Sequence, residues 1–100
     1  MPKPVDLSTI EGFDWDEANT IHIAKHNVDP KEAEEVFFDP RYKTIDDPKH
    51  SKTEERFVVY GKTGTERLLT VVFTVRSRKF RVVSARDMNR EERRLYGKET

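Results

Sequence analysis

Two of the chain's three histidines, His22 and His26, are four residues apart, and Lys25 directly precedes the second one. On a helix this spacing places both imidazoles on one face, as in many metal sites. A zinc site also needs a third protein ligand, and the sequence has no HExxH motif and only His50, in a predicted loop, as a further imidazole. We therefore rank metal binding below two simpler interpretations. His22 could be a half-buried residue bonded to a neighbour, and Lys25 and His26 could place favourable charge at a helix C-terminus.

These residues could also perform acid–base chemistry on RNA. Cleavage by RNA's own 2′-hydroxyl needs a base for that proton, an acid for the leaving 5′-oxygen, and cations for the charged transition state. Histidine can be base or acid near neutral pH, and arginine and lysine can stabilise charge without a metal. Candidate cations lie on or beside predicted strands at Arg56, Arg76, Arg81 and Arg86. Because a lone arginine is more often a solvated surface residue, composition alone leaves a nuclease as a minority interpretation.

Charge is unevenly distributed along the chain, although Lys+Arg and Asp+Glu are equal at 19 each. Residues 1–55 hold 7 basic and 14 acidic side chains, a net of −7, and residues 56–96 hold 11 and 4, a net of +7. Most of the later cations are arginines, whose planar fork suits phosphate. The pattern favours RNA, DNA or an acidic protein as a partner. An equally good interpretation is that the two parts pair with each other in the fold.

The composition limits the class of protein. One hundred residues are the size of one domain. There is no cysteine, which excludes disulfides and thiolate metal sites and fits a reducing compartment. No apolar run approaches the roughly 20 residues of a membrane helix, and the first residues lack the apolar centre of a signal peptide. We expect a cytoplasmic protein with no role in a membrane.

Helix and strand patterns together predict one α+β domain. A first helix is expected from about Asp16 to His26, and a second from Pro30, where Asp29 and Glu32 form a capping-box pattern. Alternating sequences rich in β-branched and aromatic residues predict four strands, over residues 41–46, 55–62, 67–75 and 79–86.

A short C-terminal helix is expected after these strands. Asn89 and Glu92 have capping-box spacing, and the helix should reach about Tyr96. The expected fold is a small, mostly antiparallel four-stranded sheet with two N-terminal helices and this short helix. Residues 1–12, with two prolines and no periodic pattern, are expected to be a flexible tail, and residues 13–97 a single domain.

Alternation in the last predicted strand bears on its arginines. Strict period-two geometry separates the side chains into two sets, Phe80, Val82, Ser84 and Arg86 on one face and Arg81, Val83 and Ala85 on the other. This pattern leaves open which arginine faces a substrate.

Several motifs, in order, resemble the BrnT family. "FDWDEANTIHIAKHNV" is similar to the family's W-D-x-x-N/K followed by K/R-H-G-V, and "KEAEEVFFDP" to its E-A-x-x-V-F-x-D segment. "EERFVVYGKT" resembles its E-x-R-F strand, and the end of the chain resembles its I-S-A-R and E-R-x-x-Y motifs. The resemblance covers about Phe13 to Tyr96. Asn27 stands where the family usually has glycine, and asparagine also tolerates a left-handed conformation.

The resemblance implies a ribonuclease toxin of a type II toxin–antitoxin system, RelE-like in fold, which cleaves RNA without a metal or known cofactor and inhibits translation and growth. It implies a BrnA-like ribbon-helix-helix antitoxin, with DNA bound only through the toxin–antitoxin complex. A non-catalytic module that binds the antitoxin or nucleic acid is the alternative.

The family's motif positions suggest roles for particular residues. We expect His26 or Lys25 to handle protons, Arg56 and Arg86 to hold the scissile phosphate, and Tyr96 to stack on a base or orient an arginine. Further RNA contacts are expected from other arginines, namely Arg76, Arg81 and Arg93.

Overall fold

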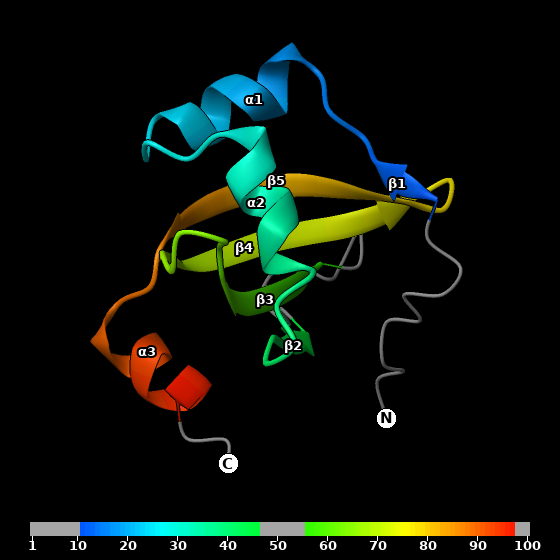
Figure 1. Ribbon diagram of the computed structural model, residues 1–100. Helices are drawn as coiled ribbons and strands as arrows, with labels where there is room; N and C mark the ends of the chain where they lie inside the picture. Colours follow the sequence, from blue (N-terminus) through cyan, green and yellow to red (C-terminus); the bar gives the residue numbers. More distant parts are fainter. Residues whose placement is uncertain (1–10, 47–55, 98–100) are drawn as a thin grey trace.

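The computed structural model describes residues 11–46 and 56–97. The predicted tail residues 1–10, and the predicted loop that contains His50, lie outside the described residues. Five strands form the sheet: β1 (Gly12–Phe13), β2 (Lys43–Asp46), β3 (Phe57–Lys62), β4 (Leu68–Arg76) and β5 (Lys79–Asp87). Their order across the sheet is β1-β5-β4-β3-β2 (Figure 1). The four predicted strands are thus confirmed, and their mutual pairing is antiparallel.

The fifth strand, β1, corrects the expected four-stranded sheet. It pairs in parallel with β5, and its two residues, Gly12 and Phe13, oppose Lys79 and Phe80. Backbone hydrogen bonds flank this short pairing, including the one of 2.8 Å from the Asp14 N–H to the Phe80 carbonyl. A two-residue strand is too short to show alternation, and it forms because the edge of β5 offers unpaired backbone groups. The sheet is therefore mixed, and its first strand begins at a residue that we expected in the tail.

The two N-terminal helices begin where local capping predicts. The helix α1 spans Glu17–Ala24, and α2 spans Pro30–Val36. Asp16 caps α1 by accepting the Asn19 N–H at 3.0 Å, while the Asn19 side chain accepts the Asp16 N–H at 2.8 Å. Asn27, with φ of 60°, adopts the left-handed conformation expected after α1.

The core lies between these two helices and one face of the sheet (Figure 1). Phe73 on β4 is fully buried, and its ring centroid lies 4.9 Å from that of Phe37 and 5.0 Å from that of Phe80. Ile23 of α1 and Val36 of α2 are also fully buried in this cluster. This packing fixes α1 and α2 on the sheet, because buried aromatic and branched side chains contribute most of the hydrophobic stabilisation.

A β-bulge in β5 overturns the strict alternation expected there. Val72 on β4 opposes Ser84, but the next residue, Phe73, opposes Val82, so Val83 is the extra residue on β5. A bulge of this kind shifts the side-chain alternation by one residue. Its position depends on how β5 pairs with β4, which the sequence of β5 alone does not reveal.

The bulge gives two arginines the same orientation. Val82 and Ala85 are both buried in the core, so the residues between and beyond them point away from α1 and α2. Arg81 opposes Thr74, and Arg86 opposes Thr70, on what we call the open face of the sheet. The expectation that Arg81 and Arg86 lie on opposite faces is therefore wrong.

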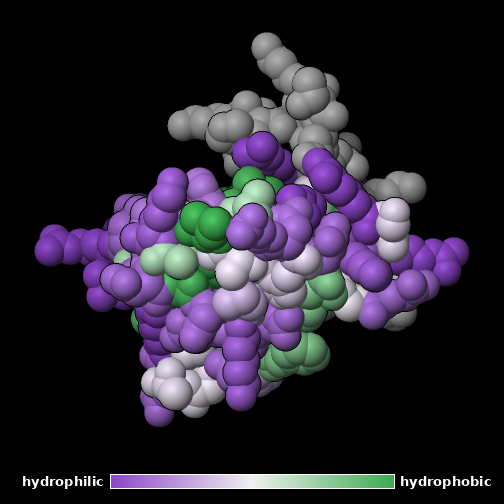
Figure 2. Space-filling model, turned by 90° about the horizontal axis from the view of Figure 1, so that it is seen from above, coloured by the Kyte–Doolittle hydropathy of each residue, from purple (hydrophilic) through white to green (hydrophobic). Residues whose placement is uncertain are grey.

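The third helix, α3 (Arg90–Gly97), lies at one end of the open face (Figure 1). It begins with the predicted capping box, because the Asn89 N–H donates to Glu92 at 3.0 Å and the Glu92 N–H donates to Asn89 at 2.8 Å. None of its residues is buried. Seen from the side of α1 and α2, the surface is mainly hydrophilic with separate apolar patches (Figure 2). In the described part of the chain, no helix is long and apolar enough to span a membrane.

Candidate functional site: a basic hollow at the open face

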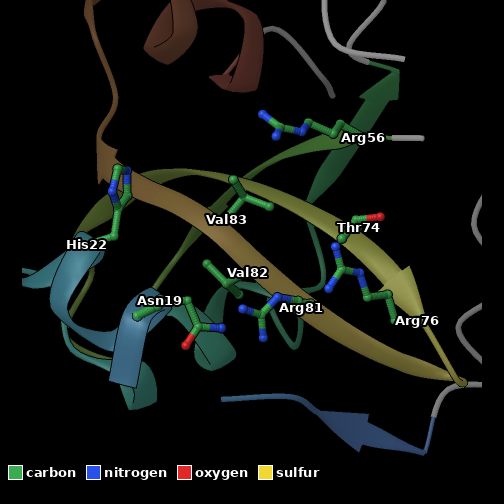
Figure 3. Close-up of a pocket in the computed structure, with 9 residues that line it drawn as sticks. Asn19, His22, Arg56, Thr74, Arg76, Arg81, Val82 and Val83 are labelled. Carbon is green, nitrogen blue, oxygen red and sulfur yellow. The ribbon is translucent and has the colours of Figure 1, made fainter. Parts of the chain in front are cut away.

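A hollow of about 290 Å³ lies where the open face meets α1. We call it the basic hollow, and its lining residues are Ala18, Asn19, His22, Arg56, Thr74, Arg76, Arg81, Val82 and Val83. Figure 3 shows His22 and Asn19 on one side of β5, Arg56 and Arg76 on the other, and Val83 between them. The volume is at the lower end for ligand sites, so it suits one phosphate and its sugar better than a long stretch of nucleic acid.

Arg56 enters the hollow from the residue before β3. It is half-buried, and its Nε is a buried nitrogen with no hydrogen-bond partner among the described residues. A buried guanidinium donor without a partner is costly, and a bound anion would satisfy it. Arg56 therefore has the geometry expected of a phosphate ligand.

Arg76 and Thr74 line the hollow from the end of β4. Arg76 is exposed and opposes Lys79 across the β4–β5 pairing, next to the tight turn that Ser77 and Arg78 form with positive φ values of 50° and 65°. The side chain of Thr74 is buried between its neighbours. The turn thus places a cationic side chain at the rim of the hollow, opposite α1.

Arg81 connects the hollow to the start of α1. Its guanidinium lies 2.8 Å from an Asp16 oxygen and 3.6 Å from an Asp14 oxygen. Hydrogen bonds from the Asn19 backbone and from Arg81 hold the pKa of Asp16 below its usual value. Arg81 thus holds the first turn of α1 against β5, and its charge is shared with two carboxylates.

His22 reaches the hollow from the last turn of α1, one turn after Asn19. Asn19 is buried and donates to the Asp14 carbonyl at 3.0 Å. His22 is exposed and lines the hollow beside it. The interpretation of a half-buried His22 is therefore wrong. The side chain lies outside the core because α1 buries Asn19 and Ile23 instead.

Arg86 lies farther along the open face, under α3. Its two terminal nitrogens donate to the two carboxylate oxygens of Glu92 at 2.7 Å and 2.8 Å, and Thr70 donates to the same carboxylate at 2.8 Å. Chiefly through the bond from Arg86, the pKa of Glu92 falls from 4.5 to about 2. The Arg86 guanidinium is therefore held by an ionised partner and is not among the residues that line the hollow.

Tyr96 fastens the other end of α3. Its hydroxyl donates to Asp39 at 2.6 Å, and Asp39 also accepts the backbone N–H groups of Lys62 and Arg41. Burial, followed by the bond to Asp39, raises the pKa of Tyr96 to about 12. Lys43 donates to the Leu95 carbonyl nearby. Polar contacts therefore hold α3 on the sheet, and Tyr96 supplies one of them.

Lys25 and His26 lie beyond the end of α1, where both are exposed. The His26 carbonyl accepts from Arg67 at 3.2 Å, and Arg67 also forms ion pairs with Glu32 and Asp87. This cluster lies at the end of β5 opposite to the hollow, since Asp87 is its last residue. Lys25 and His26, one of which we expected to handle protons, therefore lie apart from the residues that line the hollow.

Two other hypotheses from the sequence were metal binding and pairing between the acidic and basic parts of the chain. Among the described residues, no three histidine, aspartate or glutamate side chains gather where they could hold a metal ion. Pairing between the acidic and basic parts of the chain is real in part: Arg67 pairs with Glu32, Arg78 with Glu11, and Arg81 with Asp14 and Asp16. Arg93 is exposed on α3, away from the residues of the basic hollow.

The structure thus brings together three of the predicted residues, Arg56, Arg76 and Arg81, and does not bring Lys25, His26, Arg86, Arg93 and Tyr96 to the same place. Sequence reasoning did not propose Asn19, Thr74 and Val83 as site residues, and it left open whether His22 is catalytic or structural. The three-residue spacing of Asn19 and His22 on one helical stripe was the available signal.

Comparison with known proteins gives one family match. The model of the ribonuclease toxin BrnT of type II toxin–antitoxin systems matches residues 15–92. The matched span includes every residue of the basic hollow and ends within α3. No curated protein matches the chain.

Proposed function

Because the chain belongs to the family of BrnT ribonuclease toxins of type II toxin–antitoxin systems, we propose that it cleaves RNA at the basic hollow. The observation that carries this proposal is the convergence on one hollow of Arg76 from β4, Arg81 from β5 and Arg56, the residue before β3. RNA is the substrate class that fits, because its 2′-hydroxyl supplies the nucleophile and the protein need only bind the phosphate and move protons.

The arginines have different roles in the proposed reaction. Arg56 offers an unpartnered buried donor, so it holds a non-bridging oxygen of the scissile phosphate. Arg76, at the rim, neutralises the same phosphate. Arg81 adds charge while it holds α1 in place. Together they stabilise the extra negative charge of the pentacoordinate transition state, for which no metal ion is needed.

Arg86, Arg93 and Tyr96 belong to a second region of the proposed RNA surface. Arg86 is partly exposed beside Glu92, so an RNA strand that leaves the hollow along the open face could pass over it. We propose Arg93 and Tyr96 as contacts for the same strand. This keeps a binding role for Arg93 and Tyr96. It moves the scissile phosphate, which we expected Arg56 and Arg86 to hold together, to the hollow that contains Arg56.

The antitoxin is proposed to be a ribbon-helix-helix protein of the BrnA type that covers the basic hollow. Such cover would remove three arginines from contact with RNA, which accounts for neutralisation. DNA would be bound only through the toxin–antitoxin complex. The toxin would act in the cytoplasm, where RNA cleavage would inhibit translation and growth.

A variant series tests the role of the hollow. Arg56→Gln and Arg76→Gln should each lower kcat/KM on a single-stranded oligoribonucleotide by about 100-fold, as for loss of one preorganised transition-state donor. Arg78→Gln is the matched control, because Arg78 lies on the neighbouring turn, is highly exposed and, in the described part of the chain, forms an ion pair with Glu11 away from the lining of the hollow. Equal rates for all four proteins would refute the assignment. Binding without scission, on free RNA or on ribosomes, would favour the non-catalytic module.

A further inference from the structure

Among the described residues that line the basic hollow, one side chain is able to exchange a proton near neutral pH. Arginine stays protonated throughout the working range, and asparagine, threonine, valine and alanine do not titrate. His22 is the exception. Histidine in general titrates near pH 6.5 and serves as base or acid in catalysis.

The position of His22 is fixed by a rigid support. The first turn of α1 is held by its capping box and by the ion pair of 2.8 Å between Arg81 and Asp16. The next turn is held by burial of Asn19 and Ile23. His22 follows Asn19 on the same stripe and faces the hollow across β5 from Arg56 and Arg76 (Figure 3). A side chain on a packed helix is better placed for proton transfer than one on a loop.

We infer that His22 is the catalytic base of the hollow, an assignment that rests on the proposed function. Neutral His22 takes the proton of the 2′-hydroxyl, and the 2′-oxygen forms a bond to phosphorus. The bond between phosphorus and the 5′-oxygen breaks, and the 5′-oxygen keeps the electron pair and takes a proton from water. The products are a 2′,3′-cyclic phosphate and a 5′-hydroxyl, and His22 returns its proton to water.

His26 is the rival candidate for this role. It lies one turn beyond His22, and its charge contributes to lowering the pKa of Asp87, whose carboxylate is bound to Arg67. That environment is at the far end of β5. Among the described residues, the charged groups around the hollow that His22 lines are different: Arg56 before β3, Arg76 of β4 and Arg81 of β5. Lys25 and His26 follow His22 just beyond the end of α1. Because arginine side chains in general stay protonated over the working range, a change of rate with pH near neutrality would report a histidine.

The test is the pH dependence of kcat/KM in four proteins: wild type, His22→Gln, His26→Gln and Ile21→Ala. Ile21 is the neighbour of His22 on α1 and is 54% exposed, outside the lining of the hollow, so its variant controls for changes in the helix. Wild type and Ile21→Ala should gain rate as the pH rises through the histidine range and then level off. His22→Gln should lose this rise and be at least about 100-fold slower at the plateau.

A second variant separates chemistry from positioning. In His22→Ala, free imidazole should restore part of the rate, because the hollow is open to solvent, whereas imidazole should not help Arg56→Ala. His22 variants that keep the wild-type pH profile, or loss of the rise in His26→Gln alone, would overturn the inference but leave the proposed function standing. A wild-type protein that cuts no RNA would overturn the proposed function and this inference with it.

Discussion

Replacement of Glu92 by glutamine removes the carboxylate that holds α3 to the open face. The side chain keeps its shape, but its amide group cannot accept both bonds from Arg86, which are 2.7 Å and 2.8 Å long in the native protein. The native contacts of Thr70 and of the Asn89 N–H with the same oxygen are weakened as well. Since α3 buries no residue, little hydrophobic packing compensates for the loss.

The size of the expected loss of stability follows from the pKa of Glu92. A fall from 4.5 to about 2 is a difference of about 2.5 units, which corresponds to about 3.4 kcal/mol at about 1.36 kcal/mol per unit. The Glu92 side chain is 12% exposed but that of Arg86 is 41% exposed, so solvent screening reduces this upper bound. We expect Glu92→Gln to lower the free energy of unfolding by about 1–2 kcal/mol at neutral pH. For a domain of this size, each kcal/mol lost lowers Tm by about 4–8 °C.

The loss of stability in Glu92→Gln should depend on pH, and the lowered pKa of Glu92 gives the direction of that dependence. The folded protein lowers the pKa of Glu92, so its stabilising contribution is complete above pH 4.5 and is lost as the pH falls toward about 2. Urea unfolding of wild type and Glu92→Gln should therefore differ most at neutral pH and converge on acidification. Glu91→Gln, whose ion pair with Arg94 is well exposed, should have little effect at any pH. A Glu92→Gln deficit that stays constant down to pH 3 would refute the reasoning.

Two further substitutions test the packing around this region. Tyr96→Phe removes the 2.6 Å bond to Asp39 and should cost about 1 kcal/mol in urea unfolding. An ultraviolet titration should also lose the tyrosine whose pKa is raised to about 12; loss of a tyrosine that ionises near the ordinary value of about 10 would contradict the assignment. Gly61→Ala places a Cβ 2.6 Å from a Val36 methyl and 2.9 Å from the Val36 carbonyl oxygen, and should cost about 1–3 kcal/mol. The control Gly64→Ala meets only ordinary contacts from 3.5 Å, so equal losses at the two glycines would be evidence against this packing.

The features that sequence predicted well are local ones. The caps at Asp16, Asp29 and Asn89 involve partners three residues away, so the pattern and the hydrogen bond involve the same few residues. The three long strands were visible because each has several alternating or β-branched residues. The left-handed conformation of Asn27 followed from the side chain's tolerance of positive φ.

The features that sequence missed depend on pairing between distant segments. The bulge at Val83 exists only in register with β4, and it decides that Arg81 shares a face with Arg86. The strand β1 is too short to have a pattern of its own. The ion pair between Arg86 and Glu92 was also missed, because Glu92 was interpreted only as a capping residue. Glu92 both accepts the Asn89 N–H of the cap and binds Arg86.

In the candidate site too, single residues could be predicted from the sequence, but their arrangement could not. Arg56 could be proposed from the family motifs, and Arg76 and Arg81 from residue type. Their convergence with His22 requires β4, β5, the residue before β3 and α1 to be placed together. For proton transfer, the motif pointed to Lys25 and His26, which follow the end of α1. The His26 carbonyl accepts from Arg67, and the charge of His26 acts on Asp87. A shift of one helical turn is enough to change which residue faces a site. Motif spacing alone does not reveal which residue that is.

The most direct test of the central claim is an analysis of RNA ends. Purified wild-type protein and Arg56→Ala are incubated with a mixed RNA in the presence of a chelator, with and without ribosomes, and the fragments are analysed chemically. The account predicts fragments with 2′,3′-cyclic phosphate or 3′-phosphate ends from wild type, and about 100-fold fewer from Arg56→Ala. Intact RNA under all conditions, or equal cleavage by the two proteins, would contradict a ribonuclease site at the basic hollow.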